Sequence, residues 1–145
     1  AVIGASLPKD LFTTAFRDNL ELRYQGIRYD QLNGAQHDLL AQLVEIHVGK
    51  LRPGHSAIKL AETHSHFKDT YFAWIGGVEE ESVFYYRIHS PVLLVEFDHQ
   101  AGQAFPQYKE HYKDHIHVIV RTANGNDYGR DLLRQHYQRS RHHRV

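Results

Sequence analysis

The apolar residues in the first half of the chain recur every three or four positions, as they do on one face of a helix. Phe12, Phe16 and Leu20 have this spacing, and Ser6 and Pro8 before them suit the start of a helix. Asn33 with Gln36 three residues later forms a capping box ahead of a second helix. The apolar stripe of this second helix is Leu39, Leu40, Leu43, Val44 and Val48, and the helix ends over residues 50–54. A third, weaker helix is expected from Ser56 to about Phe67.

The second half has the short β-branched and aromatic runs that are typical of strands. The expected strands are Tyr71–Ile75, Val83–His89, Val92–Asp98 and His115–Arg121. Ser90-Pro91 predicts a turn, because proline cannot donate a hydrogen bond to a sheet. The polar stretch Gln100–Asp114 is long for a hairpin loop and suggests a lid or a partner surface, and a last helix is expected after Asn126 or Asp127. This order predicts a single α+β domain over residues 1–145, with helices packed on one face of a mainly antiparallel sheet of about four strands.

Composition narrows the classes of function. The formal charge is zero with 17 basic and 17 acidic residues, which argues against a dedicated nucleic-acid-binding or membrane-surface protein. No stretch approaches the roughly 18 apolar residues that span a bilayer. The absence of cysteine excludes disulfides and thiolate metal sites and leaves the cellular compartment open. Because the sequence begins at Ala1, we expect a processed product or a fragment.

Two of the 13 histidines are written His115-Ile116-His117 inside an apolar run. On a strand both imidazoles point to the same face, about 6–7 Å apart at the backbone, close enough to share one metal ion. Neutral imidazole binds zinc, iron, copper and nickel. The alternative is that His115 and His117 are half-exposed polar residues on the outer face of a sheet.

Acidic and basic residues extend this face on the expected neighbouring strands. Glu96 and Asp98 share one face of a strand that is otherwise apolar, and a buried carboxylate is costly unless it is paired or bound to a cation. Arg87 on the preceding strand and Arg121 on the last strand can reach the same patch. Two histidines and one carboxylate form the facial arrangement of non-haem iron(II) enzymes and some zinc hydrolases. The alternative is a structural ion-pair network, Arg87 with Glu96 and Arg121 with Asp98.

His99 follows Asp98 and is formally on the opposite face, so that only a bend in the strand would bring it into this site as a further ligand. The segment from Arg121 to Gly129 is rich in turn formers. It is either a well-specified strand-to-helix turn or an anion pocket that Arg121 and the start of the last helix form together.

Several motifs occur together in one order: residues 72–76 (FAWIG), 84–91 (FYYRIHSP), 95–100 (VEFDHQ), 115–117 (HIH), 121–129 (RTANGNDYG) and 131–137 (DLLRQHY). With them the second half of the chain resembles the C-terminal part of the family catalogued as domain of unknown function 3500. The resemblance implies that this chain is a C-terminal portion of a longer family chain. It also implies that Arg87, Glu96, Asp98, His99, His115, His117 and Arg121 belong to the family's signature, together with Trp74 and Asp127. Ala123 stands where the family is expected to have proline.

Two functions compete at this point. The first is a metal-dependent enzyme, a hydrolase or oxygenase, that acts on a small molecule. His115, His117, Glu96 and His99 would bind zinc, iron or copper, Glu96 or Asp98 would serve as ligand or general base, and Arg87 or Arg121 would hold an anionic group. The second is a non-catalytic binding or assembly domain that a partner chain or an N-terminal region completes. Nucleic-acid binding has only the basic tail, residues 139–145, in its favour.

Overall fold

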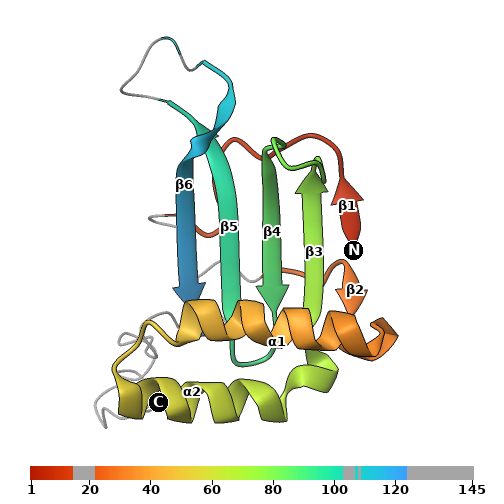
Figure 1. The fold of residues 1–145 in the computed structure, drawn as a ribbon, viewed down its shortest axis with the longest axis vertical. Helices are drawn as coiled ribbons and strands as arrows, with labels where there is room; N and C mark the ends of the chain where they lie inside the picture. The colour runs from red at the N-terminus through yellow and green to blue at the C-terminus, as the bar shows by residue number, and fades with distance from the viewer. Residues whose placement is uncertain (15–21, 103–106, 108, 124–145) are drawn as a thin grey trace, which may run out of the picture.

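The computed structural model describes residues 1–14, 22–102, 107 and 109–123, which form one sheet with two helices beside it. The sheet has six strands: β1 (Val2–Gly4), β2 (Ile27–Arg28), β3 (Tyr71–Gly76), β4 (Phe84–His89), β5 (Leu94–Ala101) and β6 (His111–Arg121). Five of them lie in the order β1-β3-β4-β5-β6, and β2 also pairs with β3 (Figure 1). All pairs are antiparallel except β1 with β3. The α+β prediction is confirmed, with two more strands than the sequence indicated.

The helices are α1 (Gly34–Val48) and α2 (Pro53–Ser65). At the start of α1 the side chain of Asn33 accepts a hydrogen bond from the Gln36 backbone, and Gln36 reciprocates, so the predicted capping box is confirmed. α2 begins three residues earlier than expected because Pro53 occupies its first turn, where the missing N–H costs nothing. Short 3-10 turns, Tyr29–Gln31 and Phe67–Asp69, flank the two helices.

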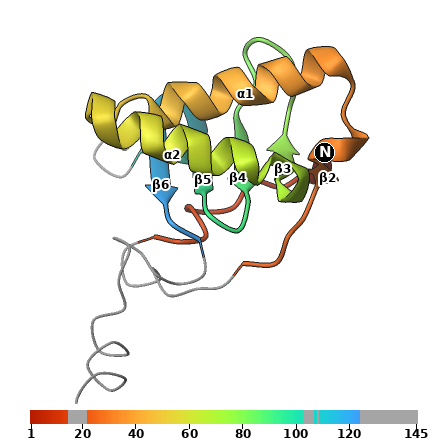
Figure 2. The ribbon, with the colours of Figure 1, turned by 90° about the horizontal axis from the view of Figure 1, so that it is seen from below.

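Both helices lie on one side of the sheet, as predicted, and the N-terminal segment crosses the other side (Figure 2). Leu40, Val44 and Val48 of α1 pack against Ile88 and Val95 of the sheet to form the main core. The helices cross only one end of this face, so that no helix of the described residues covers its other half (Figure 1).

Two expectations for the loops and the N-terminus are wrong in the described residues. Residues 8–14, the described part of the first expected helix, form bends and turns after β1. The stretch Gln100–Asp114 is shorter as a loop than expected, because β5 continues to Ala101 and β6 already begins at His111. The helix expected after Asn126 lies outside the described residues. In the described part of the chain no helix is long and apolar enough to cross a membrane.

Candidate functional site

The polar residues singled out on β4, β5 and β6 lie on one face of the sheet. The register pairs Arg87 with Glu96, and Asp98 with His117. Because side chains alternate along a strand, His115 and Arg121 share this face with His117. Six of the seven candidate residues therefore share the face that the N-terminal segment crosses, which we call the polar face.

Glu96 is fully buried at the centre of the polar face. Its Oε1 accepts hydrogen bonds from the Phe12 backbone N–H at 2.9 Å and the Tyr85 hydroxyl at 2.7 Å. Its Oε2 accepts from the backbone N–H of Thr13 at 2.9 Å and from the Thr13 hydroxyl. Four donors thus surround the carboxylate, which is how a buried charge is made tolerable without a counter-ion. Glu96 anchors the N-terminal segment and is already fully hydrogen-bonded by it.

Arg87 and Arg121 donate hydrogen bonds to backbone carbonyl oxygens and to a side-chain amide oxygen of the N-terminal part of the chain. Arg87 Nη2 donates to Gln25 Oε1 at 2.9 Å and to the carbonyl of Arg23 at 3.2 Å. Arg121 Nη2 donates to the carbonyl of Thr13 at 2.5 Å. Arg87 and Glu96 therefore take partners other than each other, and the ion pair expected between them is not formed.

In the part of the chain that the structure describes, Asp98 has one carboxylate oxygen that accepts a hydrogen bond and one that does not. It is fully buried, and its Oδ2 accepts a hydrogen bond from Gln100 Nε2 at 2.9 Å. The same nitrogen donates to Asp10 Oδ1 at 2.6 Å, so that one amide bridges two carboxylates. Asp98 Oδ1 has no hydrogen-bond partner among the described residues. Burial raises the pKa of Asp98, because the charged form loses its hydration.

His115 and His117 lie side by side, as predicted, with their rings perpendicular and 4.8 Å apart. The Nδ1 of His115 lies 3.0 Å from the carbonyl of Ala101. His117 is exposed and lines a groove of about 460 Å³ together with Asp10, Leu11 and Thr14. Within the described ranges no three histidine or carboxylate side chains come close enough together to hold a metal ion.

His99 does not join this group. It lies on the opposite face of β5, edge-on to the rings of Phe84 and Phe97, and its Nδ1 is 3.0 Å from the Phe84 backbone nitrogen. Burial lowers its pKa. The register irregularity between His99 and Ala101 does not carry His99 into the polar face, so its expected position next to His115 and His117 is wrong.

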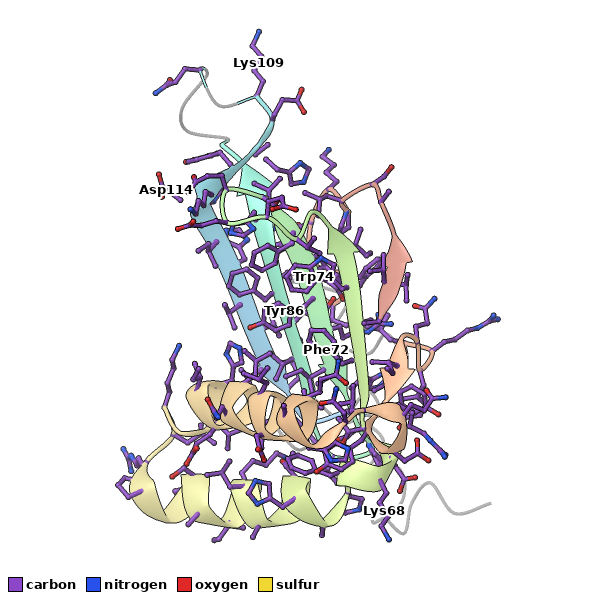
Figure 3. All side chains as sticks on the ribbon, turned by 45° about the vertical axis from the view of Figure 1, so that its right-hand side comes forward. Lys68, Phe72, Trp74, Tyr86, Lys109 and Asp114 are labelled. Carbon is purple, nitrogen blue, oxygen red and sulfur yellow. The ribbon has the colours of Figure 1, made fainter. Side chains whose placement is uncertain are left out.

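The opposite, helix-bearing face carries a second feature that sequence reasoning missed. Beyond the end that the helices cover, Trp74, Phe84 and Phe97 form a ladder, with ring centroids 4.3 Å apart for Trp74–Phe84 and 5.4 Å for Phe84–Phe97. Figure 3 shows Phe72, Tyr86 and Trp74 in a row on the sheet above α1. We call this uncovered half the open face.

Exposed aliphatic side chains border the open face. Ile116, Val118 and Val120 of β6 are 45%, 41% and 42% exposed, and Leu39 of α1 is 63% exposed. An apolar cleft of about 390 Å³ lies in the corner between α1 and the sheet, lined by Ala1, Ile27, Leu32, Gln36, Leu39, Leu40, Leu43 and Phe72. The alternation of apolar residues with histidines on β6 was the available signal, because it places Ile116, Val118 and Val120 together on the face opposite His117.

Fold and site together define an α+β domain with a polar face that the N-terminal segment crosses and an open apolar face. The family model described as protein of unknown function (DUF3500) matches residues 1–130. The chain belongs to this family, and the match also includes the first half of the chain, in addition to the second half in which the motifs lie. No curated protein and no solved structure matches the chain.

Proposed function

We propose that this chain is a binding or assembly domain without catalytic activity, and that a partner chain, or the N-terminal region of a longer chain, covers its open face. The observation that carries the proposal is the row Ile116, Val118 and Val120, which is 41–45% exposed beside an aromatic ladder. Contiguous exposed apolar surface of this kind marks interaction sites in soluble proteins.

The state of the polar face supports the same proposal. A general base or a metal ligand needs a free lone pair, whereas both oxygens of Glu96 accept hydrogen bonds from residues 12, 13 and 85. Arg121 also donates to the N-terminal segment, at the carbonyl of Thr13. These contacts are those of a structural clamp that holds residues 10–14 on the sheet.

Site-specific cross-linking tests the proposal. A photo-reactive amino acid at Leu39, in the apolar cleft between α1 and the sheet, is expected to capture one discrete polypeptide in the native host. The same substitution at Ile58, which is 73% exposed on α2, serves as the control. Addition of the captured polypeptide in purified form should shift the emission of Trp74, the single tryptophan, to the blue. Equal capture from both positions, or an unchanged emission, would contradict the proposal.

A metal-dependent enzyme is the second candidate, favoured by the 4.8 Å separation of the His115 and His117 rings. Zinc, iron(II) or copper would bind both imidazoles, and Asp98, which pairs with His117 in the sheet register, is a carboxylate with a vacant oxygen among the described residues. A metal that binds only the folded form raises the melting temperature. This candidate requires that zinc or iron(II) at neutral pH stabilises the wild type and that His117→Ala removes most of the gain. Identical melting curves with and without metal in both proteins would contradict the metal-dependent enzyme and would favour the binding or assembly domain.

A further inference from the structure

The outer edge of β6 has the features of a site for an added strand. β6 is 11 residues long and is the last strand of the sheet, and among the described residues no strand pairs with its outer side. Proteins normally protect such an edge with charged residues or proline, because its unpaired backbone groups invite another strand. Residues 115–120 contain none of these residues.

A groove follows this edge. Its lining includes four consecutive residues of the strand, Ile116, His117, Val118 and Ile119. Consecutive side chains on a strand point to opposite faces, so a groove that touches all four runs along the backbone edge and not over one face. Its volume of about 460 Å³ lies between this edge and Asp10, Leu11 and Thr14 of the N-terminal segment.

On the polar-face side of β6, the groove is bordered by carboxylates. Asp10 lines it, and the Gln100 amide connects Asp10 to the buried Asp98, whose Oδ1 has no partner in the described part of the chain. Among the described residues that line the groove, none is a lysine or an arginine. On the other side of the strand lies the apolar row Ile116, Val118 and Val120. An occupant that complements both sides alternates apolar residues with a basic residue.

We propose that the edge of β6 binds an extended segment of a partner polypeptide as an additional strand. Apolar side chains of the segment cover Ile116, Val118 and Val120, and a lysine or arginine between them enters the groove beside Asp10. This inference rests on the proposed binding function and specifies its partner. A second copy of this chain fits less well, because antiparallel pairing about Val118 would place Ile119 and no cation opposite His117.

Synthetic peptides provide the probe. The first is a blocked nonapeptide that alternates threonine and valine, with lysine at its central threonine position. The second has glutamate in place of the lysine, and the third has prolines in place of the two valines next to it. The lysine peptide is expected to bind and to slow hydrogen exchange of the amides of residues 115–120. The glutamate peptide should bind about fivefold more weakly, and the proline peptide should not bind.

Two variants separate the charge from the strand. Asp10→Asn keeps the oxygen that accepts from Leu11 N–H and Gln100, but removes the charge. It should weaken the lysine peptide about threefold to fivefold, less so at high salt, and abolish the preference over glutamate. Val118→Lys should weaken the lysine peptide about tenfold or more, while the control Val78→Lys, at a position 75% exposed and outside β6, should not.

Binding without protection of residues 115–120, or equal affinity for the lysine and glutamate peptides, would overturn the inference. A concentration-dependent dimer that binds no peptide would assign the edge to a second copy and also overturn it. The proposed function would survive either result if Leu39 still captured a partner, so the two failures are distinguishable.

Discussion

At the scale of single residues, Glu96 explains how the polar face is built. A buried carboxylate would be expelled from the core unless its lone pairs were satisfied, and residues 12, 13 and 85 supply the donors. Only one of these three, Tyr85, lies on a neighbouring strand; the other two are more than 80 positions away in the sequence. The carboxylate was therefore recognisable as unusual from the sequence, whereas its partners were not.

Glu96→Gln tests this clamp. The amide keeps the size of the side chain but turns one acceptor into a donor that faces other donors, so about 3 kcal/mol of unfolding free energy should be lost. Chemical denaturation measures the loss, and Glu80→Gln in the exposed β3–β4 loop is the control, expected within about 0.5 kcal/mol of the wild type. A Glu96→Gln protein as stable as the control would mean that the N-terminal segment is not held by this carboxylate.

His89 makes stability depend on pH. Burial, followed by the charge of Arg87, lowers the pKa of His89 from 6.5 to about 4, and its ring stacks on Tyr24 with centroids 4.3 Å apart. Between these two pH values the unfolded chain binds the proton more strongly than the folded one. The contribution of His89 is therefore complete above about pH 6.5 and is lost as the pH falls toward 4. Burial lowers the pKa of His47 and His99 as well, so they act in the same direction.

We expect the free energy of unfolding to fall by roughly 3 kcal/mol from His89 alone over this range, since one pKa unit corresponds to about 1.4 kcal/mol. The raised pKa of Asp98 opposes the trend at the acid end. Denaturant titrations at several pH values measure the slope. His89→Gln should flatten it, whereas His55→Gln, at an exposed position of α2, should leave it unchanged. Parallel slopes in both variants would contradict the role of His89.

At the scale of elements, the spacing of apolar residues and the capping motif predicted α1 correctly. The same spacing predicted a helix near the N-terminus that does not form in the described residues. Asn33 and Gln36 form their capping box within four residues, so local sequence suffices for it. The helical spacing that begins at Phe12 is equally local, but Phe12 instead packs edge-on against Tyr85, with ring centroids 5.3 Å apart. Hydrogen bonds from residues 12 and 13 to Glu96 replace those that a helix would have made.

The short strand β2 depends on one glycine. Gly26 has φ +95°, and a Cβ atom there would lie 2.1 Å from the carbonyl oxygen of Phe72 on β3. Gly26→Ala should therefore destabilise the protein by about 2 kcal/mol or more, through both strain and this clash. Gly34→Ala is the matched control, because nothing lies within 4 Å of its Cβ and it begins α1; it should be neutral or slightly stabilising. Thermal melts of both variants would contradict the argument if they were alike.

At the scale of the whole molecule, a formal charge of zero accompanies the exposed apolar row of β6. At neutral pH little net charge keeps copies of the chain apart, and the chain has 13 histidines, the residue type whose ordinary pKa lies closest to neutral pH. We expect solubility to be lowest near neutral pH and to rise on mild acidification, measured by precipitation with polyethylene glycol. Val118→Glu should raise the neutral-pH solubility by placing a charge beside the open face. A solubility that fell monotonically with acid would contradict this account.

The sequence by itself determined the α+β class, the four long strands, α1 with its cap, and the common face of Arg87, Glu96, Asp98, His115, His117 and Arg121. These features follow from alternation and from contacts between residues close in the chain. Only the tertiary structure decided that residues 12 and 13 donate hydrogen bonds to the Glu96 carboxylate and that His99 lies on the helix-bearing face of the sheet. It also decided that α1 and α2 leave half of that face open. Each of these depends on which distant segment packs against a strand, and local periodicity carries no information about that choice.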